Sequence, residues 1–147
     1  MLHRSFRRAV GAACAAALAI ACASSDSGTS EKTPSFCDVR PILESKCQRC
    51  HQDPPLHGAP FALVTYADTQ ADAATPSAPS RKRYEQMRVA VENDTMPDRS
   101  QTLDPPVSPL SCEEKATLLA WLRKGAPPAP DGEDGCKSGS SELLSCP

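Results

Sequence analysis

Two cysteines and a histidine stand within five consecutive residues, Cys47-Gln48-Arg49-Cys50-His51. Two intervening residues let a helical turn present both thiols along one edge of a flat ring, while the next residue turns its imidazole inward. Thiols with this spacing form thioethers to a porphyrin, and the adjacent histidine reaches the iron from one face. The motif therefore predicts one covalently attached haem c, with His51 as an iron ligand.

Three other interpretations of the motif are weaker. A thioredoxin-like redox pair follows a strand and opens a helix with a low-pKa thiol, whereas this pair is expected near the end of a helix. A zinc site needs a second close pair of ligands, and Cys136 and Cys146 are well separated in a tail rich in Gly and Ser. A structural disulfide between Cys47 and Cys50 leaves His51 without a role.

The rest of the chain is poor in side chains that build a core. Only 4% of the 147 residues are aromatic, 15 are prolines, and periodic apolar positions are confined to residues 36–125. The apolar faces of a haem supply the centre that these residues alone barely provide, so we expect the chain without haem to be largely unfolded. The aromatic residues expected to help form this core are Phe36, Phe61, Tyr66, Tyr84 and Trp121.

The N-terminus has the pattern of an export signal. Arg4, Arg7 and Arg8 precede an alanine-rich apolar run over residues 9–23, which is too short for a permanent membrane span. Residues Leu18-Ala19-Ile20-Ala21-Cys22 resemble the lipobox of bacterial lipoproteins, which implies cleavage before Cys22 and acylation of this residue. An ordinary signal-peptide cut after residue 23 would instead release a soluble protein.

The sequence divides into four parts. We expect a signal peptide over residues 1–21, a flexible polar tether over 22–35, a folded domain over 36–125 and a Pro/Gly/Ser-rich tail over 126–147. The whole sequence has a net charge of −2, and removal of the signal arginines makes the remainder more acidic. Nucleic acid is therefore not an expected partner, and contact with a membrane is expected only through lipid on Cys22.

The apolar spacing predicts an all-α fold without a convincing pair of strands. Asp38 is expected to cap the first helix, Asn93 to stop the third, and a capping box of Ser111 and Glu114 to start the last. The expected helices cover residues 39–50, residues 67–74, residues 81–93 and the segment between Ser111 and Gly125.

The order of these features resembles that of the class I monohaem cytochromes c. An export signal, a helix with Cys-x-x-Cys-His, a proline-rich loop, a helix, a Met-Pro loop and an aromatic-bearing last helix follow one another, and the resemblance covers residues 36–125. It implies a small cytochrome c-like helical domain wrapped around one haem, in which the first and last helices cross. In this chain, such a crossing would bring Val39 and Leu43 near Leu118 and Trp121.

The resemblance also implies the remaining contacts of the iron site. In this family a methionine late in the domain is the sixth ligand, and Met96 matches because Pro97 follows it in a polar loop. Met87 has helical spacing on an apolar face and is interpreted as core filling. His57 is the alternative ligand, although its loop would have to turn around the ring edge. Pro60 is the nearest match to the family's proline whose carbonyl faces the outer nitrogen of the axial histidine.

Four further cysteines in an exported chain favour two disulfides. They are Cys37, Cys112, Cys136 and Cys146. Three pairings are open from the sequence. If the first and last helices cross as in the family that the chain resembles, Cys37 and Cys112 come close, and Cys136 and Cys146 then close a loop in the tail.

Together these features predict a one-electron carrier rather than an enzyme. Histidine and methionine ligation raises the reduction potential relative to two histidines, and redox proteins are the expected partners. No small-molecule substrate is expected, since no acid–base or nucleophile constellation is present. Two alternatives stay open: a haem enzyme or a gas or peroxide sensor with an open distal iron position, and a haem-bearing docking subunit of a larger oxidoreductase.

One basic run, Arg81-Lys82-Arg83, is interpreted as the solvated first turn of a helix. Positive charge at a helix start opposes the helix dipole. A role toward a partner or toward the haem propionates therefore also stays open.

Overall fold

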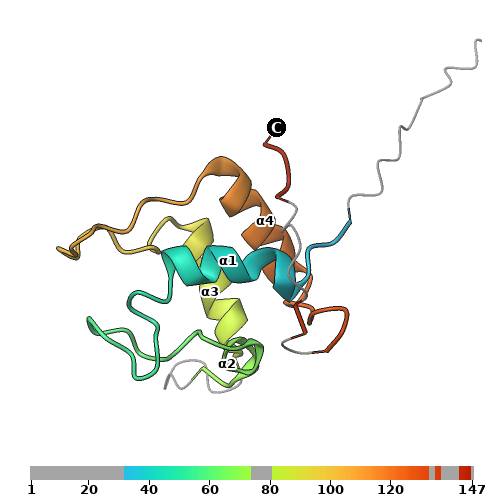
Figure 1. Cartoon of the computed structure of the whole chain (residues 1–147), viewed down its shortest axis with the longest axis horizontal. Helices are drawn as coiled ribbons and strands as arrows, with labels where there is room; N and C mark the ends of the chain where they lie inside the picture. The colour runs from blue at the N-terminus through green and yellow to red at the C-terminus, as the bar shows by residue number, and fades with distance from the viewer. Residues whose placement is uncertain (1–31, 74–80, 133–134, 137–142, 147) are drawn as a thin grey trace, which may run out of the picture. The chain divides into compact units, whose positions relative to one another are not determined.

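The part of the chain that the structure describes is helical (Figure 1). The computed structural model describes residues 32–73, 81–132, 135–136 and 143–146. The signal segment, Cys22 and the tether up to residue 31 lie outside these ranges. The helices are α1 (Phe36–Lys46), α2 (Tyr66–Gln70), α3 (Arg83–Glu92) and α4 (Cys112–Arg123).

The predicted all-α class is confirmed for the described ranges. They contain four helices and no strand, with isolated bridges between Asp72 and Lys82 and between Ala129 and Gly132. None of the helices described is long and apolar enough to cross a membrane.

α1 begins at Phe36 rather than at residue 39, and Asp38 is not its N-cap. Ser35 takes that position, and the Asp38 carboxylate reaches back to the Ser35 backbone N–H at 2.7 Å, which makes a capping box. Phe36 is only 1% exposed, so its burial also favours the earlier start. Because of this earlier start, Pro41 lies inside the helix rather than in its first turn, where a proline is best tolerated.

α2 and α3 are shorter than predicted. Ala71 leaves α2 in an extended conformation, and the backbone then pairs with the segment that precedes α3. The Ala73 N–H donates to the Arg81 carbonyl at 2.7 Å, and the Arg83 N–H donates to the Ala71 carbonyl at 3.0 Å. Backbone N–H and carbonyl groups that would form hydrogen bonds within longer helices therefore pair between these two segments instead. Asn93 is the C-cap of α3, as predicted.

α4 starts and stops where the sequence predicts. Ser111 Oγ accepts a hydrogen bond from the Glu114 backbone N–H at 3.1 Å, and the Ser111 N–H donates to the Glu114 carboxylate at 2.7 Å. Gly125 follows the helix with φ +82°, the left-handed conformation that commonly ends helices.

Replacing Ser111 by alanine is expected to lower the free energy of unfolding by about 1 kcal/mol, because the Glu114 N–H loses its side-chain acceptor. Urea denaturation followed by circular dichroism measures the loss. Ser45→Ala is the matched control, since the Ser45 hydroxyl donates only to the carbonyls of Pro41 and Ile42 in its own helix. Equal losses in both variants would contradict the capping role of Ser111.

The core lies where α1 and α3 pack against α4 (Figure 1). Val39 and Leu43 from α1 and Leu118 and Trp121 from α4 belong to one apolar cluster, and each is at most 1% exposed. The expected packing of the first helix against the last is thus confirmed.

The core continues beyond the end of α4, which the sequence analysis placed at the domain boundary. Ala126 and Ala129 are buried in the same cluster. The Trp121 indole N–H donates to the Pro127 carbonyl at 2.8 Å, and the Tyr66 hydroxyl donates to the Ala126 carbonyl at 3.1 Å. These contacts draw the chain after α4 back onto the core.

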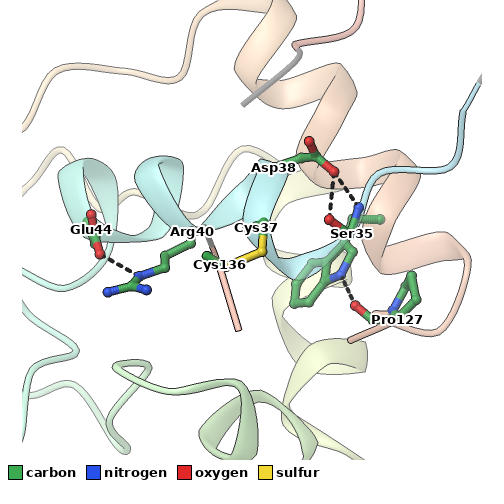
Figure 2. Close-up of a disulfide and its surroundings, with 8 residues drawn as sticks. Ser35, Cys37, Asp38, Arg40, Glu44, Pro127 and Cys136 are labelled. Atoms are coloured by element: carbon green, nitrogen blue, oxygen red, sulfur yellow. Dashed lines mark hydrogen bonds and ion pairs between the residues drawn. A yellow bond between two sulfur atoms is a disulfide. The ribbon is translucent and has the colours of Figure 1, made fainter. Parts of the chain in front are cut away.

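All four of the further cysteines form disulfides, but the predicted pairing is wrong. Cys37 in α1 is joined to Cys136 (Figure 2), and Cys112 in α4 is joined to Cys146, with Cα–Cα distances of 5.2 and 5.9 Å. The predicted Cys37–Cys112 and Cys136–Cys146 bonds assumed a separate tail. Because the chain after α4 returns to the core, each of its two cysteines instead reaches a helix.

Candidate functional site

A cavity of about 500 Å³ lies between the end of α1, one face of α3 and the loops that follow these two helices. Figure 1 shows both loops on the same side of the molecule, beyond the last residue of α1. The cavity walls are mainly apolar and include Phe61, Leu63, Val91 and Leu118. A volume and lining of this kind are typical of sites for cofactors and other small molecules.

The cavity brings together the five residues that the sequence analysis assigned to cofactor binding. Cys47, Cys50 and His51 line it from the end of α1, and Pro60 lines it from the loop that follows. Met96 lines it from the loop after α3, a part of the chain distant in sequence. His57, the alternative ligand, also lines the cavity.

The Cys-x-x-Cys-His motif directly follows α1, in hydrogen-bonded turns rather than in the helix itself. Cys47 is the C-cap, and its carbonyl accepts from the Cys50 N–H at 3.1 Å and from the His51 N–H at 2.9 Å. Neither cysteine is in a disulfide. Burial, together with the neighbouring Cys50, raises the pKa of the Cys47 thiol to about 12. Cys47 is therefore not the low-pKa thiol that a thioredoxin-like redox pair needs.

The zinc interpretation finds no support in the ranges described. No three or more His, Cys, Asp or Glu side chains there are grouped so that they could hold a metal ion by themselves. Cys136 and Cys146, the cysteines considered for a second half-site, are both in disulfides. A structural zinc ion is normally held by four such ligands.

His51 is buried, and one side of its ring is fixed. Its Nδ1 lies 2.8 Å from the backbone carbonyl oxygen of Phe61. The centroids of the His51 and Phe61 rings are 5.3 Å apart. Because a carbonyl oxygen only accepts, Nδ1 donates in this contact, and in the neutral imidazole the electron pair that can bind a metal is then on Nε2.

The residue that supplies this carbonyl is a correction to the sequence analysis, which assigned the role to Pro60. The Leu63 N–H donates to the His51 carbonyl at 2.7 Å, and this bond sets the register of the loop along the motif. In that register the Phe61 carbonyl faces Nδ1. Pro60 contributes to the cavity wall.

Two methionines line the cavity. Met96 is 39% exposed, whereas Met87 is 8% exposed and belongs to the core cluster. The interpretation of Met87 as core filling is thus incomplete, because the same face of α3 both packs in the core and forms a cavity wall. Its helical spacing among apolar residues gave no signal that separates these two environments.

The loop between α3 and α4 supplies a further wall that the sequence analysis missed. Leu103 and Val107 line the cavity from this loop, and both are half-buried. Isolated apolar residues in a polar, proline-rich segment are the only sequence signal for them, and such residues have no periodicity that predicts burial.

The chain matches no protein-family model, no curated protein and no solved structure. The functional assignment therefore depends on the residues of the cavity and their chemistry.

Proposed function

We propose that this chain is a c-type cytochrome of the class I kind, which carries single electrons on one covalently bound haem. The observation that carries the proposal is the convergence of Cys47, Cys50, His51 and Met96 on one apolar cavity. Two thiols outside any disulfide, an imidazole with an available Nε2 and a thioether are the donor set that such a haem requires. The residues present therefore fit the group.

Each residue has a distinct role in this proposal. Cys47 and Cys50 would tether the porphyrin through thioether bonds, and His51 through Nε2 and Met96 through its sulfur would bind the iron. The Phe61 carbonyl holds His51 in one orientation. When bound, the haem supplies one-electron chemistry through ferric and ferrous iron.

We also propose that the protein is exported and anchored by lipid on Cys22 at the periplasmic face of a bacterial membrane, where redox proteins are its partners. The signal pattern and lipobox of residues 1–22 support this location. The two disulfides support it as well, because such bonds form and persist in oxidising compartments.

Absorption spectra of Met96→Leu and Met87→Leu test the axial ligand, and with it the proposed function. We expect the wild-type ferric protein, expressed with the haem-attachment machinery, to show a weak far-red band from sulfur-to-iron charge transfer. Met96→Leu should abolish the band and leave high-spin iron. Met87→Leu keeps the volume of a buried cavity-lining residue and should retain the band.

Other outcomes separate the alternatives. Loss of the band in Met87→Leu but not in Met96→Leu would identify Met87, in α3, as the ligand. High-spin iron in the wild type would favour the enzyme or sensor with an open distal position, an outcome to which the exposure of Met96 gives some weight. Failure of the wild-type chain to acquire haem would overturn the proposal.

A further inference from the structure

Arg83, the first residue of α3, lies over the loop that holds His51. Its guanidinium carbon is 4.9 Å from the centroid of the Phe61 ring. Its Nη1 donates to the carbonyls of Ala62 at 3.4 Å and Asp68 at 3.3 Å, and lies 3.8 Å from the Asp68 carboxylate. A planar guanidinium stacks on aromatic rings and donates in several directions at once, which a lysine ammonium does not reproduce.

The interpretation of the basic run as the solvated first turn of a helix is wrong, because α3 begins only at Arg83, with Lys82 as its N-cap and Arg81 before it. Arg81 is exposed, and Lys82 pairs with the exposed Asp72 at 2.7 Å. Arg83 Nε, by contrast, is buried and has no hydrogen-bond partner among the residues described. A buried N–H without a partner is unfavourable, so the contacts that hold the guanidinium in place have to outweigh this loss.

Phe61 is the link between Arg83 and His51. Its carbonyl receives the His51 Nδ1–H at 2.8 Å, while its ring lies beneath the Arg83 guanidinium. The next carbonyl along the chain, that of Ala62, is held by Arg83 directly. One side chain of α3 therefore holds the two consecutive residues whose backbone positions the imidazole.

We propose that Arg83 is a positioning residue for His51: by holding Phe61 and Ala62, it keeps the Phe61 carbonyl against Nδ1 and so sets the orientation and donor strength of Nε2. This inference rests on the proposed function, in which Nε2 is an axial ligand. A firm Nδ1–H···O bond makes the imidazole more basic. A more basic ligand favours ferric over ferrous iron, so this contact lowers the reduction potential.

The test compares Arg83→Lys with Arg81→Lys in the full-length, haem-loaded protein. Both substitutions keep the positive charge, so the Coulomb effect on the iron is conserved, but only Arg83→Lys removes the contacts with Phe61 and Ala62. We expect the His51 Nδ1–H of the ferrous protein to exchange with solvent about tenfold faster in Arg83→Lys, as measured by NMR. The reduction potential should rise in the same variant, and Arg81→Lys should match the wild type in both measurements.

Phe61→Leu is the second variant, because it keeps the backbone carbonyl and removes the ring beneath the guanidinium. It should shift the exchange rate and the reduction potential in the same direction. The effects of the two substitutions should be less than additive, since both remove the stacking of Arg83 on Phe61. If Arg83→Lys fails to fold, Phe61→Leu decides the test. An exchange rate and a reduction potential in Phe61→Leu equal to those of the wild type would overturn the role of Arg83. If the wild type carries haem and Arg83→Lys has the same exchange rate and reduction potential, the role of Arg83 is overturned but the proposed function stands. If the wild type carries no haem, both the role of Arg83 and the proposed function are overturned.

Discussion

A chain in which both Cys47 and Cys50 are replaced by alanine is expected to carry no covalently bound haem. These are the two thiols that line the cavity outside any disulfide, so no other described cysteine is available for thioether bonds there. Haem-dependent peroxidase staining after denaturing electrophoresis measures the covalent fraction, which should fall from nearly complete to background. Each single substitution should leave one thioether and an intermediate yield.

The matched control removes two cysteines that do not line the cavity. The double substitution Cys37→Ser and Cys136→Ser also eliminates a cysteine pair, but that pair forms a disulfide at the start of α1. Its haem content should stay close to that of the wild type. Covalent haem in the alanine variant would refute attachment through the motif. Loss of haem in both variants would show that folding, rather than attachment, limits the yield.

Local chemistry explains which parts of the fold the sequence predicts well. Ser111 and Glu114, three positions apart, predict the start of α4, and the structure contains this capping box. The predicted start of α1 was wrong, although Ser35 and Asp38 have the same spacing as Ser111 and Glu114. There the decisive contribution is the burial of Phe36 in the core, a tertiary effect that the local pattern does not contain.

The disulfide pairing could not be predicted for a similar reason. It depends on the path of the chain after α4, and the residues that fix this path in the core are Ala126 and Ala129. Small side chains in a proline-rich segment give no periodic signal. The Leu144 N–H, which donates to Thr117 Oγ1 at 2.7 Å, adds a backbone contact that the amino-acid sequence does not reveal.

The candidate site shows the same division. Cys47, Cys50 and His51 were found because their spacing is local and chemically demanding. The Phe61 carbonyl was missed because a shift of one residue in a loop depends on how the loop closes, which the Leu63–His51 bond decides. The position of Arg83 over this loop follows from the packing of α3, so its sequence neighbours suggested only a solvated turn.

Removal of the Cys37–Cys136 disulfide by serine at both positions is expected to lower the free energy of unfolding by about 4.7 kcal/mol, because the bond closes a loop with a sequence separation of 99 residues. Guanidinium denaturation of the oxidised proteins measures this loss. The bond also holds the returning chain against α1 near the capping box of Ser35 and Asp38 (Figure 2). Fraying of the α1 start is therefore expected to add to this loop-entropy value.

The Cys112–Cys146 disulfide is the internal comparison for this prediction. Its sequence separation is 34 residues, for which the same relation gives about 3.8 kcal/mol. Loop length alone thus predicts only a small difference between the two losses in the free energy of unfolding. A larger difference would measure the contribution of native contacts around α1. A greater loss on removal of Cys112–Cys146 would contradict the prediction. It would mean that the end of the chain, through its contact with α4, stabilises the fold more than the bond that closes the longer loop.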